Sequence, residues 1–413
     1  MKMSKWLKIL IIVIVIIVGG MAGLVIYFYP QARPAIGPPV ADVSKLLNAN
    51  MVNTNANLRI NANATNLVPE IITPTIQGPF TILGNFKMDV FAKDLKTPRV
   101  LIFDEQNNLL VSAMGEGKVY AIKSDGSKVV LASGLNNPHG LALNNGYLYI
   151  AETNKVSRYT YDLVNLKLGK KEFLFNLPSG GVHFTRTLQF GPNGFLYVAV
   201  GSSCNVCHES DERRATILKY DPANWSYEVF AKGLRNTVFF VLNPRTKQFW
   251  GNDMGRDNLG DNLPPDDLNI LSAGKNYGWP ICYGDKVHDT NFDKNVYVRD
   301  PCMDSVAPIY EYNSHNAPLG LTFIDSKMFP QSWQGDLLVS LHGSWNSSAP
   351  VGYKVVHLKI DGNKVVSSED FITGFLVNGG AIGRPVDLVF GKDGALYLSD
   401  DKAGVVYKIY RQG

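Results

Sequence analysis

Residues 386–410, VDLVFGKDGALYLSDDKAGVVYKIY, contain the pattern that decides the fold. The apolar run VDLVF is followed by the turn residues GKDG and then by a second apolar run, ALYLS, which ends in two aspartates. Short runs rich in Val, Leu and Tyr, bounded by Gly and Asp, are typical of antiparallel strands joined by tight turns. The segment is therefore predicted to be a hairpin whose second strand ends in polar residues.

The same hairpin pattern occurs at five earlier places in the chain. When the segments are stacked on one apolar position, they begin at Arg99, His139, Arg186, Val238 and Leu319. The shared apolar position is Phe103, Leu143, Phe190, Leu242, Phe323 and Phe390. A β-sandwich would also have many strands, but it would not repeat one hairpin six times. Six repeats at intervals of about 40 to 80 residues predict an all-β fold, a six-bladed β-propeller.

The propeller domain is predicted to cover residues 86–413. Phe86–Leu95, FKMDVFAKDL, is expected to supply an outer strand to the last blade and so to close the ring. The largest insertion lies between the fourth and fifth repeats and begins with Gly251–Pro280. Five aspartates fall within this stretch, namely Asp253, Asp257, Asp261, Asp266 and Asp267. Carboxylates together with turned carbonyls suit a hard cation such as calcium, and the alternative is a long solvated loop.

The bulk composition is that of a packed, β-rich protein. The chain has 413 residues, of which 45% are hydrophobic and 18% charged, with a net charge of +4. It contains no Lys/Arg run of the kind that binds phosphate backbones, so nucleic acid is not expected as a partner.

The N-terminus carries a membrane signal. Ile9–Tyr29 is free of charge and long enough to span a bilayer as a helix, and lysines precede it. Residues 1–29 are therefore predicted to be a transmembrane anchor that leaves the catalytic domain extracytoplasmic, in the periplasm or at the cell surface. A cleaved signal peptide is the alternative. Residues 30–85, rich in Pro and Asn, are predicted to be a disordered linker.

Four cysteines fit an extracytoplasmic location. Cys204 and Cys207 form a C-x-x-C, and Cys282 and Cys302 bracket a polar segment. Of the three possible pairings, the local one, Cys204–Cys207 with Cys282–Cys302, is expected in an oxidising compartment.

Polar residues at the entry to each innermost strand should converge at one end of the central channel. Upstream of the aligned apolar positions lie Arg99, His139, His183 with Arg186, Arg235 with Asn236, and Arg384. This excess of Arg and His favours an anionic ligand, because the guanidinium group matches carboxylates. The alternative for some of these arginines is pairing with local Asp or Glu. A histidine at His183 could act as a general base or could be only a hydrogen-bonding residue.

At these residues the chain resembles the PQQ-dependent soluble glucose and sorbosone dehydrogenase family, which includes aldose and pyranose dehydrogenases. The resemblance runs from about Pro98 to Tyr410 and is nearest to the sorbosone dehydrogenase branch. The segments that carry it include GGVHFTRTLQFGPNGFLYVAVGSSCNVC, ERRATILKYDP, GLRN, NDMGRDNLGDNLPPDDLN, KNYGWP, GDLLVSLHGSWN and GRPVDLVFGKDGALYLSDD.

The resemblance implies a propeller that binds pyrroloquinoline quinone (PQQ) and Ca²⁺ over its channel and oxidises a sugar. His183 matches the catalytic base, and Arg235 with Asn236 matches the pair beside the quinone. Hydride then passes to a cofactor carbonyl carbon that calcium and Arg235 polarise. Gly255 and Arg256 match the residues whose main-chain oxygens bind the calcium.

Further cofactor contacts are implied for the remaining matched positions. These are Arg384, Arg99, His342, Trp345 and Asn346. The chain departs from the family at Thr237–Phe240, after GLRN, where Pro and Gly are usual, and at Ser347, where Arg is common.

The expected partners are a small-molecule sugar, the membrane, and a membrane quinone or another extracytoplasmic electron carrier. Two other functions fit a six-bladed propeller. A calcium-dependent lactonase or hydrolase would place several acidic ligands around the channel, and a non-catalytic binding module would need no base.

Overall fold

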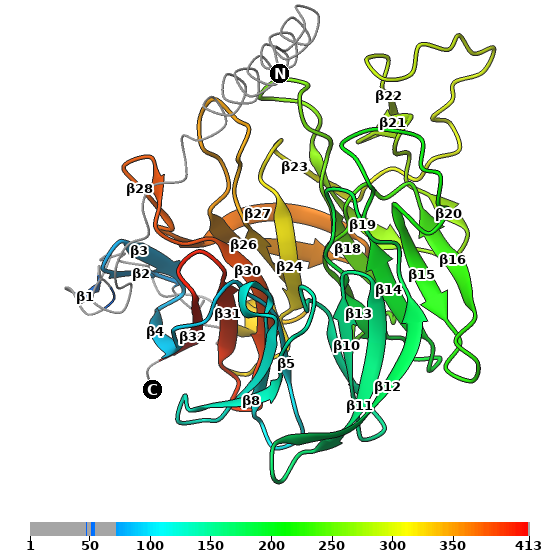
Figure 1. Cartoon of the computed structure of the whole chain (residues 1–413). Helices are drawn as coiled ribbons and strands as arrows, with labels where there is room; N and C mark the ends of the chain where they lie inside the picture. The colour runs from blue at the N-terminus through cyan, green and yellow to red at the C-terminus, as the bar shows by residue number, and fades with distance from the viewer. Residues whose placement is uncertain (1–46, 48–50, 54–71, 412–413) are drawn as a thin grey trace, which may run out of the picture.

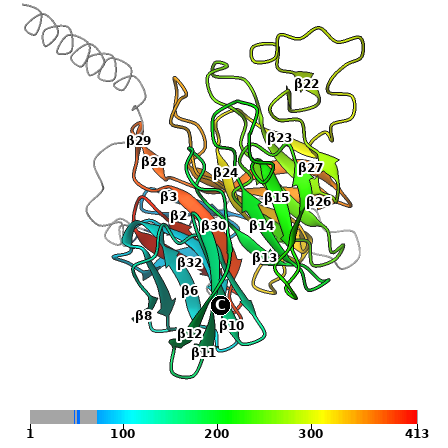
Figure 2. The same ribbon diagram turned by 45° about the vertical axis from the view of Figure 1, so that its right-hand side comes forward.

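The computed structural model describes residues 47, 51–53 and 72–411. Within these residues six antiparallel sheets are arranged in a ring around a central channel (Figure 1 and Figure 2), so the predicted six-bladed propeller is confirmed. In both views the segment that carries β21 (Cys282–Tyr283) and β22 (Val287–His288) projects away from the blades.

The first three blades follow one another along the chain, each as a meander from the channel outward. Their strands are β5 (Pro98–Phe103), β6 (Leu109–Ala113), β7 (Lys118–Ile122) and β8 (Lys128–Ala132); β9 (Leu141–Asn144), β10 (Tyr147–Glu152), β11 (Lys155–Asp162) and β12 (Lys167–Asn176); and β13 (Leu188–Phe190), β14 (Leu196–Val200), β15 (Thr216–Tyr220) and β16 (Tyr227–Lys232). The short strand β20 (Lys275–Asn276) pairs in parallel with β16. A 3-10 helix, η2 (Met114–Glu116), joins β6 to β7.

The last three blades include the insertion and both ends of the ring. Their strands are β17 (Phe240–Leu242), β18 (Phe249–Asp253), β19 (Asp266–Leu271) and β23 (Tyr310–Tyr312); β24 (Pro318–Phe323), β25 (Leu337–Leu341), β26 (Lys354–Asp361) and β27 (Lys364–Thr373); and β30 (Pro385–Phe390), β31 (Leu396–Asp400), β32 (Val405–Arg411) and β4 (Phe86–Ala92). This half of the chain also contains η3 (Gln331–Trp333) and the hairpin of β28 (Leu376–Val377) with β29 (Gly380–Ala381).

The ring is closed by pairing the N-terminal strand β4 with the C-terminal strand β32. Their antiparallel register runs from Phe86↔Arg411 to Ala92↔Val406. The Tyr410 hydroxyl donates to the Asp89 carboxylate at 2.6 Å, which adds a side-chain bond across the same seam. The outer strand expected from Phe86–Leu95 is therefore confirmed.

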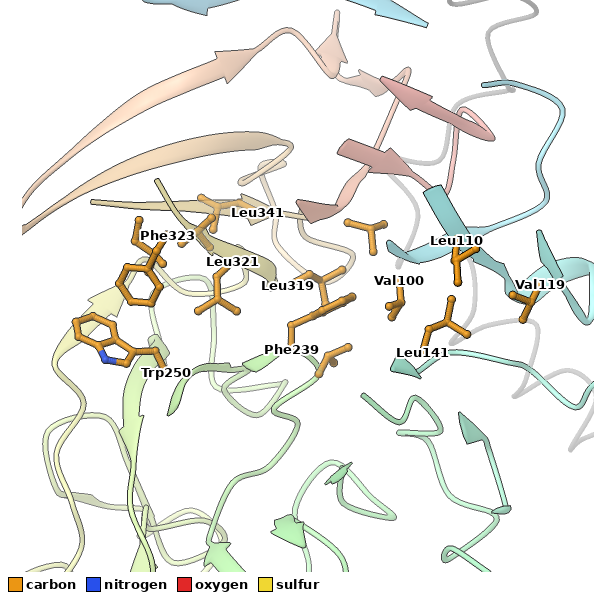
Figure 3. Close-up of a cluster of buried hydrophobic side chains, with 14 of the residues drawn as sticks. Val100, Leu110, Val119, Leu141, Phe239, Trp250, Leu319, Leu321, Phe323 and Leu341 are labelled. Atoms are coloured by element: carbon orange, nitrogen blue, oxygen red, sulfur yellow. The ribbon is translucent and has the colours of Figure 1, made fainter. Parts of the chain in front are cut away.

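The innermost strands are the ones that the repeat predicted. The shared apolar positions lie in β5, β9, β13, β17, β24 and β30, at the last or next-to-last residue of each strand. Along the second strands, side chains on both faces are buried, because each blade packs between two neighbours. Blade-to-blade packing joins residues far apart in sequence, such as Val100, Leu141, Phe239 and Leu319 near the channel (Figure 3).

The predicted linker is wrong at its C-terminal end. Residues 72–85 contain β2 (Pro74–Gln77) and β3 (Phe80–Leu83), and β3 pairs with β27 on the outer edge of the fifth blade. The physical reason is the alternating burial of these strands, which places Phe80 and Ile82 in the core. β1 (Met51–Asn53) pairs with β2 and extends this sheet further.

Gln77 shows how firmly this segment belongs to the fold. Its side chain is 1% exposed and hydrogen-bonds to the backbone N–H and C=O of Met88, as a neighbouring strand would. Oε1 accepts from the Met88 amide at 3.0 Å, and Nε2 donates to the Met88 carbonyl at 2.7 Å. Nε2 also donates to the Leu47 carbonyl at 3.1 Å.

The predicted anchor, residues 1–29, and most of the predicted linker lie outside the described residues. Among the described residues no helix combines the length and the apolar character that crossing a membrane requires. Both predicted disulfides, Cys204–Cys207 and Cys282–Cys302, are present.

We expect Gln77→Ala to lower the free energy of unfolding by about 2–3 kcal/mol, because it leaves a buried amide and a buried carbonyl of Met88 without partners. The measurement is urea denaturation followed by tryptophan fluorescence. Thr81→Ala, on the exposed face of β3, is the control and should stay within about 0.5 kcal/mol of the parent. Equal stability of the two variants would contradict the integration of residues 72–85 into the propeller.

Candidate active site

A polar pocket of about 450 Å³ opens at the end of the channel where the inner strands begin. Loops of the third, fourth and fifth blades build it. Its lining residues are Val182, His183, Asn205, Arg235, Asn236, Met254, Gly255, Asp257, Asn258, Asp266, His315, Ala317, Ser344, Trp345 and Asn346. Of the predicted site residues, the pocket brings together His183, Arg235, Asn236, Gly255, Trp345 and Asn346.

His183 precedes β13 and is held in one tautomer by Ser202. Nδ1 lies 2.9 Å from Ser202 Oγ and 3.1 Å from the Ser202 carbonyl oxygen. The Ser202 hydroxyl donates its own proton to the Cys204 carbonyl at 2.7 Å, so both oxygens facing Nδ1 are acceptors. Nδ1 therefore carries the proton, and Nε2 keeps its lone pair. The network assigns this tautomer.

The charge state of His183 follows from its surroundings. Burial lowers the pKa of His183 to about 3, and the neighbouring Arg235 charge acts in the same direction. The imidazole is consequently neutral across the physiological range. A neutral ring with a free Nε2 at a pocket wall has the form that a general base requires.

Arg235 lies 4% exposed between the third and fourth blades, and all five of its N–H groups are committed to the protein. Nε donates to the Asn205 carbonyl at 2.8 Å, and Nη1 donates to the carbonyls of Met254 and Gly255 at 3.3 and 2.8 Å. Nη2 donates to Asn205 Oδ1 and to the Asp257 carboxylate at 2.8 and 2.9 Å. Arg235 is thus a fixed cation with no N–H group left for a further hydrogen bond.

Asp257 links two sides of the pocket. One carboxylate oxygen receives the Arg235 bond, and the other accepts from Asn346 Nδ2 at 2.7 Å. Asn346 belongs to the loop between β25 and β26, whereas Asp257 belongs to the loop between β18 and β19. The pair therefore fixes the fifth-blade loop, including Trp345, against the fourth. Trp345 is 49% exposed and lines the pocket.

Close approach at Gly255 and Gly201 explains why glycine stands there. A Cβ on Gly255 would lie 2.5 Å from the Pro265 carbonyl oxygen. A Cβ on Gly201 would lie 2.7 Å from both Asn236 Oδ1 and His183 Cβ, so glycine allows the base and the amide to come together.

Asp266 is the buried carboxylate beside the Gly255 turn. It accepts from the amides of Gly255 and Ala317, both at 2.9 Å. Burial raises the pKa of Asp266 to about 7, although these two amide bonds favour its charged form. A cation near Asp266 would stabilise the carboxylate further, since an opposite charge favours the ionised state.

Three predicted cofactor contacts lie outside the lining of this pocket and form a network of their own. Arg99 makes an ion pair with Asp401 at 2.7 Å, and His342 Nε2 lies 3.0 Å from the same carboxylate. Arg384 donates to the carbonyls of His342 and Gly343 through Nε and Nη2, and its guanidinium lies 5.5 Å from the centre of the Tyr353 ring. Burial, followed by the Arg384 charge, lowers the pKa of His342 to about 4.

The two residues predicted to bind calcium through their main-chain oxygens are neighbours in the turn after β18. Gly255 lines the pocket, and its carbonyl accepts from Arg235. Both Gly255 and Arg256 line a smaller adjoining cavity, where the Arg256 side chain makes an ion pair with Asp289 at 2.6 Å. Asp267 also lines this smaller cavity, and its Oδ1 is buried without a hydrogen-bond partner within the described chain.

Asn205 and His315 are among the lining residues that the sequence did not single out. Asn205 lies inside the C-x-x-C, in a loop that follows a second strand instead of entering a first one. His315 lies just before β24, the innermost strand of the fifth blade. It therefore occupies the same kind of position, the entry to an innermost strand, as His183 does before β13. His315 Nε2 lies 2.7 Å from the Gly260 carbonyl oxygen.

The fold and the pocket define a class: a six-bladed propeller with a neutral histidine and a fixed cation at the mouth of its channel. The chain belongs to the TrAA12-like family, whose sequence model matches residues 80–412.

Individual relatives extend this assignment. An uncharacterised protein of Borreliella burgdorferi is 30% identical over 83% of this chain and 93% of its own length. The pyrroloquinoline quinone-dependent pyranose dehydrogenase of Coprinopsis cinerea is 27% identical over 80% of this chain, and the match spans 54% of that enzyme. The holo structure of its PQQ domain has a TM-score of 0.70 at 23% identity, covering 80% of this chain and 97% of that domain. The resemblance inferred from the sequence is confirmed at the level of the family.

We expect His183 to remain neutral from pH 8 down to about pH 4, because its folded pKa is about 3. In ¹⁵N-histidine-labelled protein its ring nitrogens should show no titration in this range, and the proton should sit on Nδ1. In urea the same residue should titrate near pH 6.5. Between these two pKa values the unfolded chain binds a proton at His183 and the folded chain does not. The free energy of unfolding therefore falls as the pH drops below 6.5, by at most about 1.4 kcal/mol per pH unit. A folded-state midpoint between pH 6 and 7 would refute this account.

Proposed function

We propose that this protein oxidises a sugar, such as an aldose, sorbosone or a related compound, with PQQ and Ca²⁺ at the pocket. The observation that carries the proposal is the pairing of His183, whose Nε2 is free, with the fixed charge of Arg235 at one pocket wall. A binding module needs no such base. The family membership and the name of the Coprinopsis relative support the same reaction type.

The residues present fit a cofactor of this kind together with a cation. The carbonyl of Gly255 and the carboxylates of Asp257 and Asp266 offer the oxygen ligands that calcium takes. The carbonyl of Arg256 would join them if the turn presents it to the pocket. Asn236 and the Trp345 indole offer polar and aromatic contacts to a planar ligand. Arg384 precedes the first strand of the sixth blade and donates to the Gly343 carbonyl. From there its guanidinium would bind a carboxylate of the cofactor.

Each residue then has a separate task. His183 Nε2 takes the proton of the sugar hydroxyl, while Ser202 holds the ring and Nδ1–H in place. Arg235 supplies a positive charge that needs no reorganisation, because its hydrogen bonds are already made. Trp345 and the exposed Val182 shape the rim against which a sugar can lie. When bound, PQQ supplies the acceptor for the hydride.

The location and the electron acceptor are part of the proposal. The charge-free stretch Ile9–Tyr29 and the two disulfides support a membrane-anchored protein whose propeller is extracytoplasmic. From that position electrons would pass to a membrane quinone or to another extracytoplasmic carrier.

Reconstitution tests the function. The full chain is purified in detergent, loaded with PQQ and CaCl₂, and assayed with an artificial electron acceptor and a panel of aldoses, pyranoses and sorbosone. We expect sugar-dependent reduction that needs both additions and is lost with EDTA. A chain that takes up no PQQ and reduces no acceptor contradicts the proposal. Hydrolysis of lactones with calcium alone would favour the hydrolase instead.

We expect His183→Ala to lower kcat by about 10²–10⁴-fold while PQQ uptake stays within about threefold of the parent, because the base acts on the sugar and not on the cofactor. Turnover is measured with the artificial acceptor, and uptake by absorbance after gel filtration. Loss of PQQ uptake together with turnover would show that His183 only maintains the pocket.

We expect Gly255→Ala to weaken PQQ and calcium uptake by about 10- to 100-fold, since the new Cβ would collide with the Pro265 carbonyl and displace the turn. Isothermal titration gives both affinities. Gly380→Ala is the matched control, because a Cβ there meets only the Val377 carbonyl oxygen, at an ordinary 3.5 Å. Unchanged binding in Gly255→Ala would place the calcium elsewhere.

A further inference from the structure

The turn formed by residues 202–207, closed by the Cys204–Cys207 disulfide, touches both functional groups of the pocket. We refer to it as the disulfide turn. It leaves β14 at its inner end and returns toward β15, so it lies between the base on one side and the cation on the other.

On the side of the cation, Asn205 is the contact. Its carbonyl and its Oδ1 accept two of the five Arg235 hydrogen bonds, each at 2.8 Å. Oδ1 also accepts from the Asp257 amide at 2.7 Å, and Nδ2 donates to the Asp257 carbonyl at 3.0 Å. One side chain thus holds both Arg235 and the residue that pairs with it.

On the side of the base, Ser202 is the contact. It is fully buried, and its hydroxyl can accept from His183 Nδ1 only because it donates to the Cys204 carbonyl. The Ser202 amide donates to the Arg235 carbonyl at 2.8 Å, which ties the start of the turn to the cation as well. The disulfide fixes Cys204 and so fixes the oxygen on which this arrangement depends.

We propose that the disulfide turn is a positioning element for the oxidation reaction: Asn205 orients Arg235 and Asp257, and Ser202 with Cys204 sets the tautomer of His183. This inference rests on the proposed function for its kinetic consequence, whereas the geometric consequence is testable without it. Errors of about 1 Å at a catalytic group cost on the order of 10²-fold in rate, so a small turn can have a large effect.

The kinetic test compares Asn205→Ala and Asn205→Asp in the PQQ- and calcium-loaded full chain. Asn205→Ala removes three side-chain contacts and should lower kcat about 10- to 100-fold, with KM for the sugar within about threefold and the thermal midpoint nearly unchanged. Asn205→Asp keeps the two acceptor contacts of Oδ1 and should recover part of the loss. Full activity of Asn205→Ala, or a loss that follows the thermal midpoint in both variants, overturns the proposal.

The two disulfides provide a matched pair. Cys204→Ser/Cys207→Ser opens a loop with a sequence separation of 3, and Cys282→Ser/Cys302→Ser opens one with a separation of 20. The longer loop contributes more to stability, so the second double variant should lose more in thermal midpoint. The first should lose more in kcat. The reverse order of kcat losses contradicts a positioning role for the disulfide turn.

Two measurements on the protein without cofactor separate this inference from the proposed function. In Asn205→Ala, amide hydrogen exchange in residues 254–258 should be faster than in the parent. In Cys282→Ser/Cys302→Ser, exchange in the same residues should be as slow as in the parent. In Ser202→Ala, His183 loses one of the two acceptors that face Nδ1 and keeps the main-chain carbonyl, so its ¹⁵N shifts should show a larger share of the Nε2-protonated tautomer than in the parent. If both hold and no sugar is oxidised, the positioning role stands and the dehydrogenase function fails. Unchanged exchange and an unchanged tautomer overturn the positioning role whatever the activity.

Discussion

The pairing of β4 with β32 is the constraint on which the rest of this structure depends. A six-bladed ring has no hydrophobic core that any single blade completes, because each sheet is buried only between two neighbours. The seam from Phe86↔Arg411 to Ala92↔Val406 joins the two ends of the propeller and leaves neither end blade exposed. Loops from blades far apart in sequence then meet at one channel mouth, and the pocket exists only as a result of that closure.

Inside the pocket, the polar side chains are held in place by hydrogen bonds to other protein groups. Arg235 has no N–H group left for a ligand, and Asp257 spends one oxygen on Arg235 and the other on Asn346. Burying such charged groups is unfavourable in free energy. During a reaction, however, they need no reorganisation, because they are already oriented. The histidine follows the same rule, since its proton is placed on Nδ1 by a serine that is itself oriented by a carbonyl. The site is organised before any ligand arrives.

The blades and the disulfides could be predicted because their signals are local: short apolar strands, Gly and Asp turns, and short cysteine spacings. The ring closure, which pairs Phe86 with Arg411, followed from the repeat, because a propeller needs a strand that completes its last blade. The end of the linker could not be predicted, because Ile82 pairs with Ile372, far away in the sequence, and no repeat marks that contact. For the same reason, the arginines at the channel mouth predicted an anion site, but Arg99 is neutralised by Asp401, 302 residues later. The matched family positions for His183, Arg235 and Asn236 do meet in one pocket. Their chemical roles, however, depend on Asn205 and Ser202, whose spacing gave no sign of function.

The position of β2 and β3 has a mechanical consequence. The chain does not enter the ring directly at β4; it first passes along the edge of the fifth blade, where Gln77 is bonded to Met88 and Ile82 pairs with Ile372. A pulling force applied to the chain before residue 72 would therefore load this edge first. Part of that force would reach β4 through the Gln77–Met88 hydrogen bonds, and part would be borne by the β3–β27 pairing, so tension on the N-terminal side is divided between two blades before it reaches the β4–β32 seam.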